Sequence, residues 1–200
     1  MKVMRVIAVF MAVMCGIASA NLLTNPGFET GDTSSWDAGG WYIGSGGDAQ
    51  SGSYGLAYYV PPSTGGDSWF VAYQLAPVTE GLTYDASCWM RYAGTANNSE
   101  QFLEIQWLNG LGEIMWGNGV GSTPVSGPQE YTFYELDDLV APAGAVQASV
   151  RAVVHTTGVT TDNAWHTFDN FSFQQAIPEP STMALIGIAV GVLGLTRRRK

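Results

Sequence analysis

Aromatic and planar polar side chains recur at every second position in three short segments of this chain. In residues 82–91, 102–108 and 147–155 they alternate with apolar residues, so in extended strands they would point away from a core. These outward sides carry Trp89, Arg91, Phe102, Glu104, Gln106, Arg151 and His155. If the three segments share one sheet, the side chains form one patch, whose rings can stack on a sugar and whose polar groups can meet its hydroxyls. This patch is our candidate carbohydrate site.

The patch includes both arginines of the central region, Arg91 and Arg151. A guanidinium donates a charged fork of N–H groups, so the two arginines could bind an acidic sugar. The competing interpretation is that they only pair with Glu104 and neighbouring acids. Further aromatic candidates are Trp41, Tyr42, Tyr58, Tyr59, Trp69 and Trp116, whereas Trp36 and Trp107 are predicted core residues.

Residues 21–176 are strongly acidic. Sixteen Asp and Glu residues stand against Arg91 and Arg151 in this region, which gives a net charge of −14. Nucleic acid is excluded as a partner, because phosphate binding needs clustered Lys and Arg. Zinc or iron is not expected, because His155 and His166 are the only histidines of the sequence and no Cys/His cluster exists. The many aromatic residues predict a folded domain rather than a disordered one.

The elements that would position the patch are short strands. Clusters of Gly, Pro, Asn and Ser interrupt residues 21–173 about every ten residues, and no long segment has a helical period. Besides the three segments above, strands are predicted at 54–60, 70–75, 131–136 and 167–173. Each strand has an apolar side, which predicts an all-β sandwich of two packed sheets over residues 21–173.

Residues 1–20 are predicted to be a cleaved signal peptide. Lys2 and Arg5 precede an apolar run at 6–13, and residues 18–20 (Ala-Ser-Ala) form a small-x-small cleavage site. The mature protein would then begin at Asn21, and the protein would be exported.

Catalysis is not expected from this sequence. No Gly-x-Ser-x-Gly elbow, His-Glu-x-x-His or phosphate loop is present. A glycoside hydrolase needs only two carboxylates at the right separation, but a lone sandwich of this size rarely offers the deep cleft around them.

Cys15 would leave with the signal, so Cys88 has no disulfide partner in the mature chain. Cys88 is predicted to be a small buried hydrophobic residue, and the alternative is a reactive thiol.

Residues 174–200 have the organisation of a sorting signal. A linker leads to Pro178, Glu179 and Pro180, an apolar segment follows at 183–195, and the basic residues 197–200 end with Lys200 after Arg197, Arg198 and Arg199. The apolar segment is shorter than the ~20 residues of a stable transmembrane helix. The tail resembles the PEP-CTERM sorting signal. That resemblance implies a short hydrophobic helix, a transient hold on the inner membrane and an exosortase-type processing enzyme; a permanent membrane anchor is the alternative.

The start of the mature region resembles the opening of jelly-roll carbohydrate-binding modules of the family 4/9/22 type. The matching residues run from Asn21 to Gly31 and are followed by Trp36. Residues 78–84, 141–145 and 168–171 agree with the same pattern in the same order. The resemblance implies that the two packed sheets form a jelly roll.

Modules of this type commonly hold one structural Ca²⁺ through oxygen ligands. By position, the resemblance implies that the ligands here would be Glu29 and Asp169, with backbone oxygens near Gly52 and Ser53. The alternative is that both carboxylates are satisfied by water.

Together these observations predict an exported, non-catalytic protein of the cell surface or extracellular matrix. We expect it to bind extracellular polysaccharide, and the PEP-CTERM resemblance implies an association with exopolysaccharide or biofilm. The alternatives are a structural or adhesive surface protein of the same fold without a glycan site and, less favoured, a small secreted glycoside hydrolase.

Overall fold

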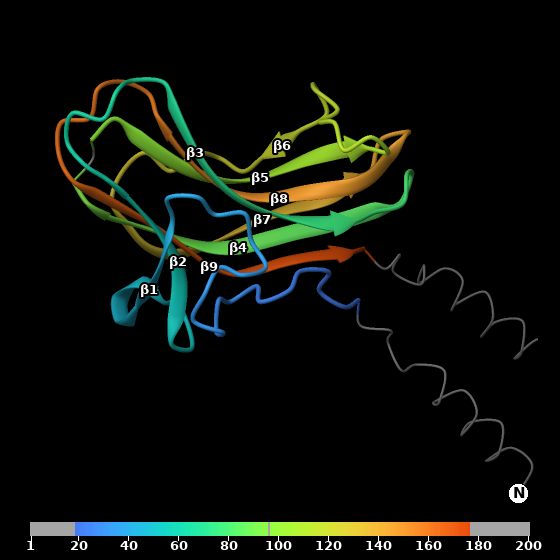
Figure 1. The fold of residues 1–200 in the computed structure, drawn as a ribbon, viewed down its shortest axis with the longest axis horizontal. Helices are drawn as coiled ribbons and strands as arrows, with labels where there is room; N and C mark the ends of the chain where they lie inside the picture. The colour runs from blue at the N-terminus through green and yellow to red at the C-terminus, as the bar shows by residue number, and fades with distance from the viewer. Residues whose placement is uncertain (1–18, 96, 177–200) are drawn as a thin grey trace, which may run out of the picture. The chain divides into compact units, whose positions relative to one another are not determined.

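The computed structural model describes residues 19–95 and 97–176, and Figure 1 shows them as two layers of strands. The five-stranded sheet has the order β1-β2-β9-β4-β7, and the four-stranded sheet has the order β3-β8-β5-β6. The elements are β1 (Tyr42–Ser45), the 3-10 turn η1 (Gly46–Asp48), β2 (Tyr54–Val60), β3 (Ser68–Pro77), β4 (Thr83–Gly94), β5 (Ser99–Asn109), β6 (Val120–Gly121), β7 (Gln129–Val140), β8 (Ala145–Thr156) and β9 (Ala164–Gln175). The strand pairs are antiparallel, and the prediction of an all-β sandwich is confirmed.

The predicted strands correspond to the long strands of both sheets. The strand predicted at 54–60 coincides with β2, and the others lie within the longer strands β3, β4, β5, β7, β8 and β9, except that β4 begins at Thr83 and leaves the predicted first residue, Leu82, exposed outside it. The sequence analysis missed β1 and β6, which are four and two residues long. Segments this short carry too few alternating positions to show a period.

The core lies between the two sheets. Cys88 and Met90 of β4, Phe168 of β9, and Leu103 and Ile105 of β5 are all 0% exposed. The prediction that Cys88 is a buried hydrophobic residue is therefore confirmed. Burial of each large apolar side chain contributes about 1.5–3 kcal/mol to folding. All core residues belong to one compact unit, residues 20–175, so the sandwich has a complete core of its own.

The segment before β1 is tied to both sheets. The Leu22 N–H donates to the Phe173 carbonyl at 2.8 Å, which adds the start of the segment to β9. Further along, Asp37 and Tyr73 exchange two backbone hydrogen bonds of 2.9 Å, which cover the middle of the edge strand β3. These bonds occupy backbone groups that an open sheet edge would leave unpaired.

Strand β9 contains a bulge that the sequence analysis did not foresee. The simple alternation predicted for 167–173 places Phe168 and Phe171 on opposite sides, yet they are 0% and 2% exposed and both belong to the core. Asn170 has φ +49°, and the register with β4 shifts at this point. The extra residue returns Phe171 to the core side and leaves Asp169 on the other side.

Among residues 19–95 and 97–176, no helix has the length and hydropathy that crossing a membrane requires. Most of the predicted signal peptide, and the tail from residue 177 onward, lie outside the described residues.

Candidate functional site

The predicted patch is divided between the two sheets. Trp89 and Arg91 lie on β4 in the five-stranded sheet. The remaining members lie on β5 and β8, which are neighbours in the four-stranded sheet: Phe102, Glu104, Gln106, Arg151 and His155. The prediction of one continuous patch was therefore wrong, because consecutive strands β4 and β5 belong to different sheets.

The outer face of the four-stranded sheet has a polar row at its centre, where Tyr73, Arg151 and Glu104 lie side by side on β3, β8 and β5. Arg151 donates from Nη1 to Glu104 Oε2 at 3.2 Å and from Nε to Ser149 Oγ at 3.0 Å. Gln106 Nε2 donates to the other Glu104 oxygen at 2.8 Å. The side chains of Arg151 and Glu104 are only 17% and 20% exposed. Arg151 is thus engaged in an ion pair, as the competing interpretation predicted.

An exposed tryptophan lies on the same face toward one end of the strands. Trp69 of β3 is 56% exposed, and its ring stacks on His155 with centroids 3.9 Å apart and planes at 19°. His155 lies between two carboxylates, with Nδ1 2.9 Å from Glu100 and Nε2 3.1 Å from Asp67. Asp67 also accepts a hydrogen bond from Trp69 Nε1, and its bonds with His155 and Trp69 lower its pKa. Trp69 is therefore held on one side and offers its other side to solvent.

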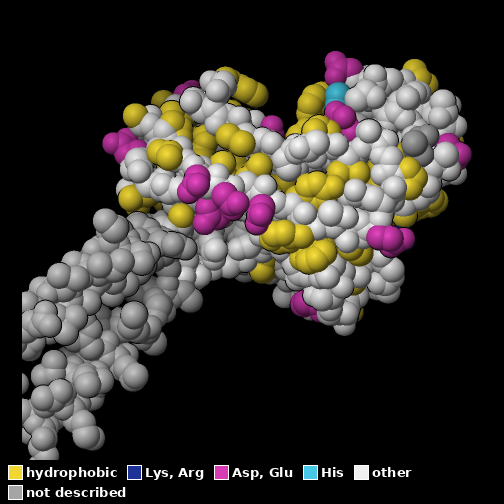
Figure 2. Space-filling view, turned by 180° about the vertical axis from the view of Figure 1, so that it is seen from behind, with side chains coloured by type: hydrophobic (Ala, Val, Ile, Leu, Met, Phe, Trp, Pro, Cys, Tyr) yellow, Lys and Arg dark blue, Asp and Glu magenta, His cyan; other side chains and the backbone are white. Residues whose placement is uncertain are grey.

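This outer face forms the floor of a hollow. In Figure 1 loops rise above the four-stranded sheet at both ends of its strands, and Figure 2 shows a hollow between two lobes on that side. Hydrophobic and acidic side chains gather around the hollow. Such a concave surface with exposed rings can hold an extended ligand along the sheet.

The loop between β5 and β6 reaches over this face. The Met115 N–H donates to the Trp107 carbonyl, and Val120 pairs with Ile105, which is two residues earlier on β5. Residues 116–119 therefore form a loop between these two points on the edge of the sheet. A Cβ on Gly119 would overlap the side chain of Gln106, which places the loop against the outer face. This loop carries Trp116, which is 79% exposed.

The other half of the predicted patch lies on the five-stranded sheet. The Trp89 ring packs 5.5 Å from Phe133 of the edge strand β7. Arg91 donates from Nη1 to the Gly47 carbonyl at 2.9 Å, while its nitrogens lie 3.8 Å from Asp48 and 3.7 Å from Glu130. These two carboxylate distances are longer than hydrogen bonds.

The two carboxylates implied as calcium ligands lie beside the loop before β2. Asp169 accepts backbone N–H groups of Gln50 and Ser51 at 2.8 and 3.2 Å, and Glu29 accepts those of Ser53 and Tyr54 at 3.0 and 3.1 Å. Burial raises the pKa of Asp169, and the charge of Glu29 raises it further. A cation between them would relieve both effects.

The oxygens near Glu29 and Asp169 are of the kind that a hard cation such as Ca²⁺ prefers, although both carboxylates also accept backbone N–H groups. A Cβ on Gly27 would lie 3.1 Å from Asn170 Oδ1 and 3.7 Å from Asp169 Oδ1, so amide and carboxylate oxygens converge there. Within the described part of the chain, no three His, Cys, Asp or Glu side chains gather as a metal site. Glu29 and Asp169 would therefore hold the ion together with amide and backbone oxygens.

A serine–histidine pair lies inside the sandwich. Ser99 Oγ is 2.9 Å from His166 Nε2, and Gln101 Oε1 is 3.1 Å from His166 Nδ1. Such a pair can activate a nucleophile, but Ser99 and His166 are 1% and 0% exposed. Ser99 also bonds to Asn97, so the pair belongs to a buried polar network that a substrate does not reach.

Sequence reasoning missed Tyr73 and misplaced some of the aromatic candidates. Trp69, Val71, Tyr73 and Leu75 alternate along β3 and form its outer side, a signal that the sequence analysis could have used. Trp41 was a loop candidate, but it is a core residue, 8% exposed. Trp36 and Trp107 are core residues, as predicted. Tyr42, Tyr58 and Tyr59 lie on the short strands β1 and β2, in the five-stranded sheet.

Comparison with protein families identifies the tail. The model of the PEP-CTERM protein-sorting motif matches residues 176–200. The motif residues proposed from sequence, Pro178, Glu179, Pro180, Arg197, Arg198 and Arg199, lie within this match but outside the described residues. None of the curated proteins matches the chain.

Comparison with solved structures identifies the fold. The CBM22-1 xylan-binding domain of Paenibacillus barcinonensis Xyn10C has a TM-score of 0.54 at 17% identity, covering 80% of this chain and 97% of that one. TmCBM61, solved with β-1,4-galactotriose, has a TM-score of 0.52 at 20% identity, covering 79% and 100%. The enzymatically active domain of tailspike protein 4 from bacteriophage CBA120 has a TM-score of 0.60 at 17% identity, covering 78% of this chain but 21% of that chain. The chain therefore contains a jelly-roll sandwich with the fold of carbohydrate-binding modules, followed in the sequence by a PEP-CTERM sorting motif.

Proposed function

We propose that the protein is exported and binds polysaccharide at the outer face of its four-stranded sheet, without catalysing a reaction. The observation that carries this proposal is the fixed, half-exposed ring of Trp69, which stacks on His155 above a hollow face. Large rigid rings of this kind supply most of the energy at many binding sites. Tyr73, Arg151 and Gln106 lie four to six residues further along the strands on the same face, where they provide planar polar groups for the hydroxyls of an extended sugar chain.

Two further observations support the choice of ligand. The neighbours named above include a xylan-binding domain and a module solved with β-1,4-galactotriose, both with the same fold. In the described part of the chain, the arginine of this face is Arg151, and it is paired with Glu104, so it is not free to attract an acidic sugar. A neutral polysaccharide therefore fits the face better than an acidic one.

The carboxylates on this face support a non-catalytic role. Glu100 and Glu104 are four residues apart on β5, which is about 13 Å along a strand. Glycosidases place their two carboxylates about 5 to 10 Å apart, which excludes Glu100 and Glu104 as a pair. Asp67 lies closer to Glu100, but both of these carboxylates are bonded to the ring of His155. Glu104 is also bound by Arg151 and Gln106, and Glu100 by His155.

The sorting motif supports a location at the cell envelope or surface. We propose that an exosortase-type enzyme recognises the tail, and that the short apolar segment at 183–195 holds the protein in the inner membrane before processing. Association with exopolysaccharide or biofilm would follow from that location together with the glycan-binding face.

The test compares Trp69→Ala with Phe133→Ala in residues 21–176, on a glycan array that includes xylohexaose and β-1,4-galactotriose. Phe133 is a matched control, because it is 45% exposed but lies on the five-stranded sheet. Binding should fall at least about tenfold in Trp69→Ala and stay unchanged in the control. Binding that is as strong in Trp69→Ala as in the unchanged domain would refute this face as the site. If no glycan binds the unchanged domain, a structural or adhesive role becomes the better explanation.

A further inference from the structure

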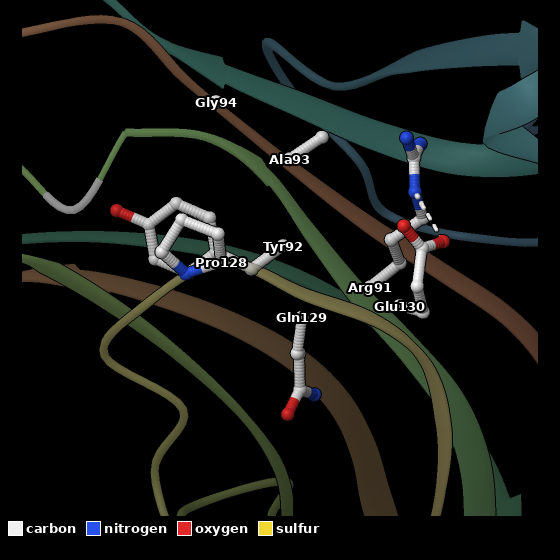
Figure 3. Close-up of a pocket in the computed structure, with 7 residues that line it drawn as sticks. All are labelled: Arg91, Tyr92, Ala93, Gly94, Pro128, Gln129 and Glu130. Carbon is white, nitrogen blue, oxygen red and sulfur yellow. Dashed lines mark ion pairs between the residues drawn. The ribbon is translucent and has the colours of Figure 1, made fainter.

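A second depression lies on the opposite sheet. Residues 91–94 of β4 and residues 128–130 at the start of β7 line an open hollow of about 500 Å³ (Figure 3). The register between the two strands shifts between Met90 and Tyr92, where β7 has one residue more than β4, as in a β-bulge. The hollow lies at this irregularity of the five-stranded sheet, whereas Trp69 belongs to the four-stranded sheet.

One wall of this hollow offers hydrogen-bond donors. Arg91 has five N–H groups, and among the described residues it makes one hydrogen bond, to the Gly47 carbonyl. Figure 3 shows the side chain of Arg91 beside that of Glu130, whose carboxylate is 3.7 Å from Arg91 Nε. The Arg91 side chain is 24% exposed and the Glu130 side chain 95%. Arg91 is thus held in place with donors to spare, while Glu130 is free to adjust.

Two aromatic residues lie next to Ala93 and Gly94, which are two of the residues that line the hollow. Trp165 of β9 lies next to Ala93, and its ring passes over Gly94, where a Cβ would approach Trp165 Cε3 to 3.3 Å. Gly94 has φ +104°, a conformation that favours glycine. The ring of Tyr59 lies 5.1 Å from that of Trp165, and the two residues are 38% and 37% exposed.

These features suit the two kinds of surface that a sugar presents. The rings of Trp165 and Tyr59 offer a flat apolar surface. A sugar hydroxyl beside Arg91 and Glu130 could accept from the guanidinium and donate to the carboxylate, because at 3.7 Å the two groups form an ion pair without a hydrogen bond between them. With Asp48 also near Arg91, the local charge is negative, so an anionic sugar is disfavoured.

We propose that this hollow is a second glycan site, which binds a neutral sugar through Arg91, Glu130 and the ring of Trp165. It lies on the outer side of the sheet opposite to the Trp69 face, so one domain can hold two polysaccharide chains at once. Such a protein cross-links polysaccharide instead of only adhering to it. The second site does not depend on the first.

The test for binding is nuclear magnetic resonance on ¹⁵N-labelled residues 21–176, titrated separately with methyl β-glucoside, methyl β-galactoside, methyl β-xyloside and xylohexaose. At least one sugar should shift the signals of Ala93, Gly94 and the Trp165 indole N–H. These shifts should persist in Trp69→Ala and disappear in Arg91→Gln and Trp165→Ala. The remaining signals report whether each variant is folded. The proposal is overturned if no sugar moves these signals, or if Trp69→Ala abolishes the shifts.

The two sites fail independently in this experiment. Shifts near Trp165 without shifts near Trp69 would refute the proposed function but not the second site, and the reverse pattern would refute the second site alone. Cross-linking is then measured as precipitation of the sugar identified above in its polymeric form. Precipitation by the unchanged domain but by neither Trp69→Ala nor Trp165→Ala is expected. Precipitation by both variants would contradict cross-linking through these sites.

Discussion

Acid should destabilise the sandwich through one buried histidine. His166 is 0% exposed and bonds to Ser99 and Gln101, and burial lowers its pKa from 6.5 to about 3. In the unfolded chain the ring takes up a proton near pH 6.5, whereas in the folded domain it stays neutral. The unfolded state therefore binds more protons in this window, so the stability present above pH 6.5 is lost progressively down to about pH 3.

The size of the effect follows from the pKa difference. Each pH unit below the pKa of the unfolded chain lowers the free energy of unfolding by about 1.4 kcal/mol. At about pH 4.5, His166 therefore lowers the free energy of unfolding by about 2 to 3 kcal/mol. Asp169 acts in the opposite direction, because its pKa is raised and its protonation favours the folded state as the pH falls. The total pH dependence mixes both groups, so the contribution of His166 has to be isolated with a variant.

The assay is urea unfolding of residues 21–176 with and without His166→Gln, at several values between about pH 7 and pH 4.5. The Gln amide is uncharged at every pH in this range. Between about pH 7 and pH 4.5, the free energy of unfolding should therefore fall by about 2 to 3 kcal/mol less in the variant than in the unchanged domain. A lower stability of the variant at neutral pH does not affect this comparison. Parallel curves, with a constant difference at every pH, would refute the reasoning.

Two further predictions concern the loop before β2. Gly52→Ala should lower the unfolding free energy by about 1 to 3 kcal/mol, since Gly52 has φ +68° and an added Cβ would overlap the carboxylate of Glu29; urea unfolding measures this, and Gly39→Ala, with open space around it, should have little effect. If Ca²⁺ binds at Glu29 and Asp169, adding it after treatment with EDTA should raise the melting temperature of the domain but not that of Asp169→Asn. An unchanged melting temperature in the unchanged domain would argue against the ion.

The sequence predicted the sandwich because alternation identifies the apolar side of each strand. It could not assign strands to sheets, because alternation contains no information about the neighbouring strand. β4 and β5 follow each other with only four residues between them, yet the chain crosses from one sheet to the other there. That crossing separates Trp89 and Arg91 from the five other residues of the predicted patch.

The bulge in β9 shows a second limit of the sequence pattern. Asn170 lies among apolar residues at the expected spacing, and only its φ of +49° shows that it is an extra residue. Asparagine tolerates this conformation better than most residues, which is a weak signal in one sequence. The bulge is what directs Asp169 toward the loop at 50–54, where the calcium prediction can be tested.

The two arginines, which could have bound an acidic sugar or only paired with acids, illustrate how composition limits a site. In a region with sixteen acidic residues and two arginines, each guanidinium has a carboxylate nearby. A buried or half-buried cation is stabilised by pairing with such a carboxylate. Arg151 has done so with Glu104 at 3.2 Å, while Arg91 keeps unused donors but lies between Asp48 and Glu130. Neither arginine therefore creates a positive surface. If the domain binds sugar, binding has to depend on rings and on hydrogen bonds to charges that are already balanced by a neighbour, which is why both proposed sites centre on an exposed tryptophan and on neutral sugars.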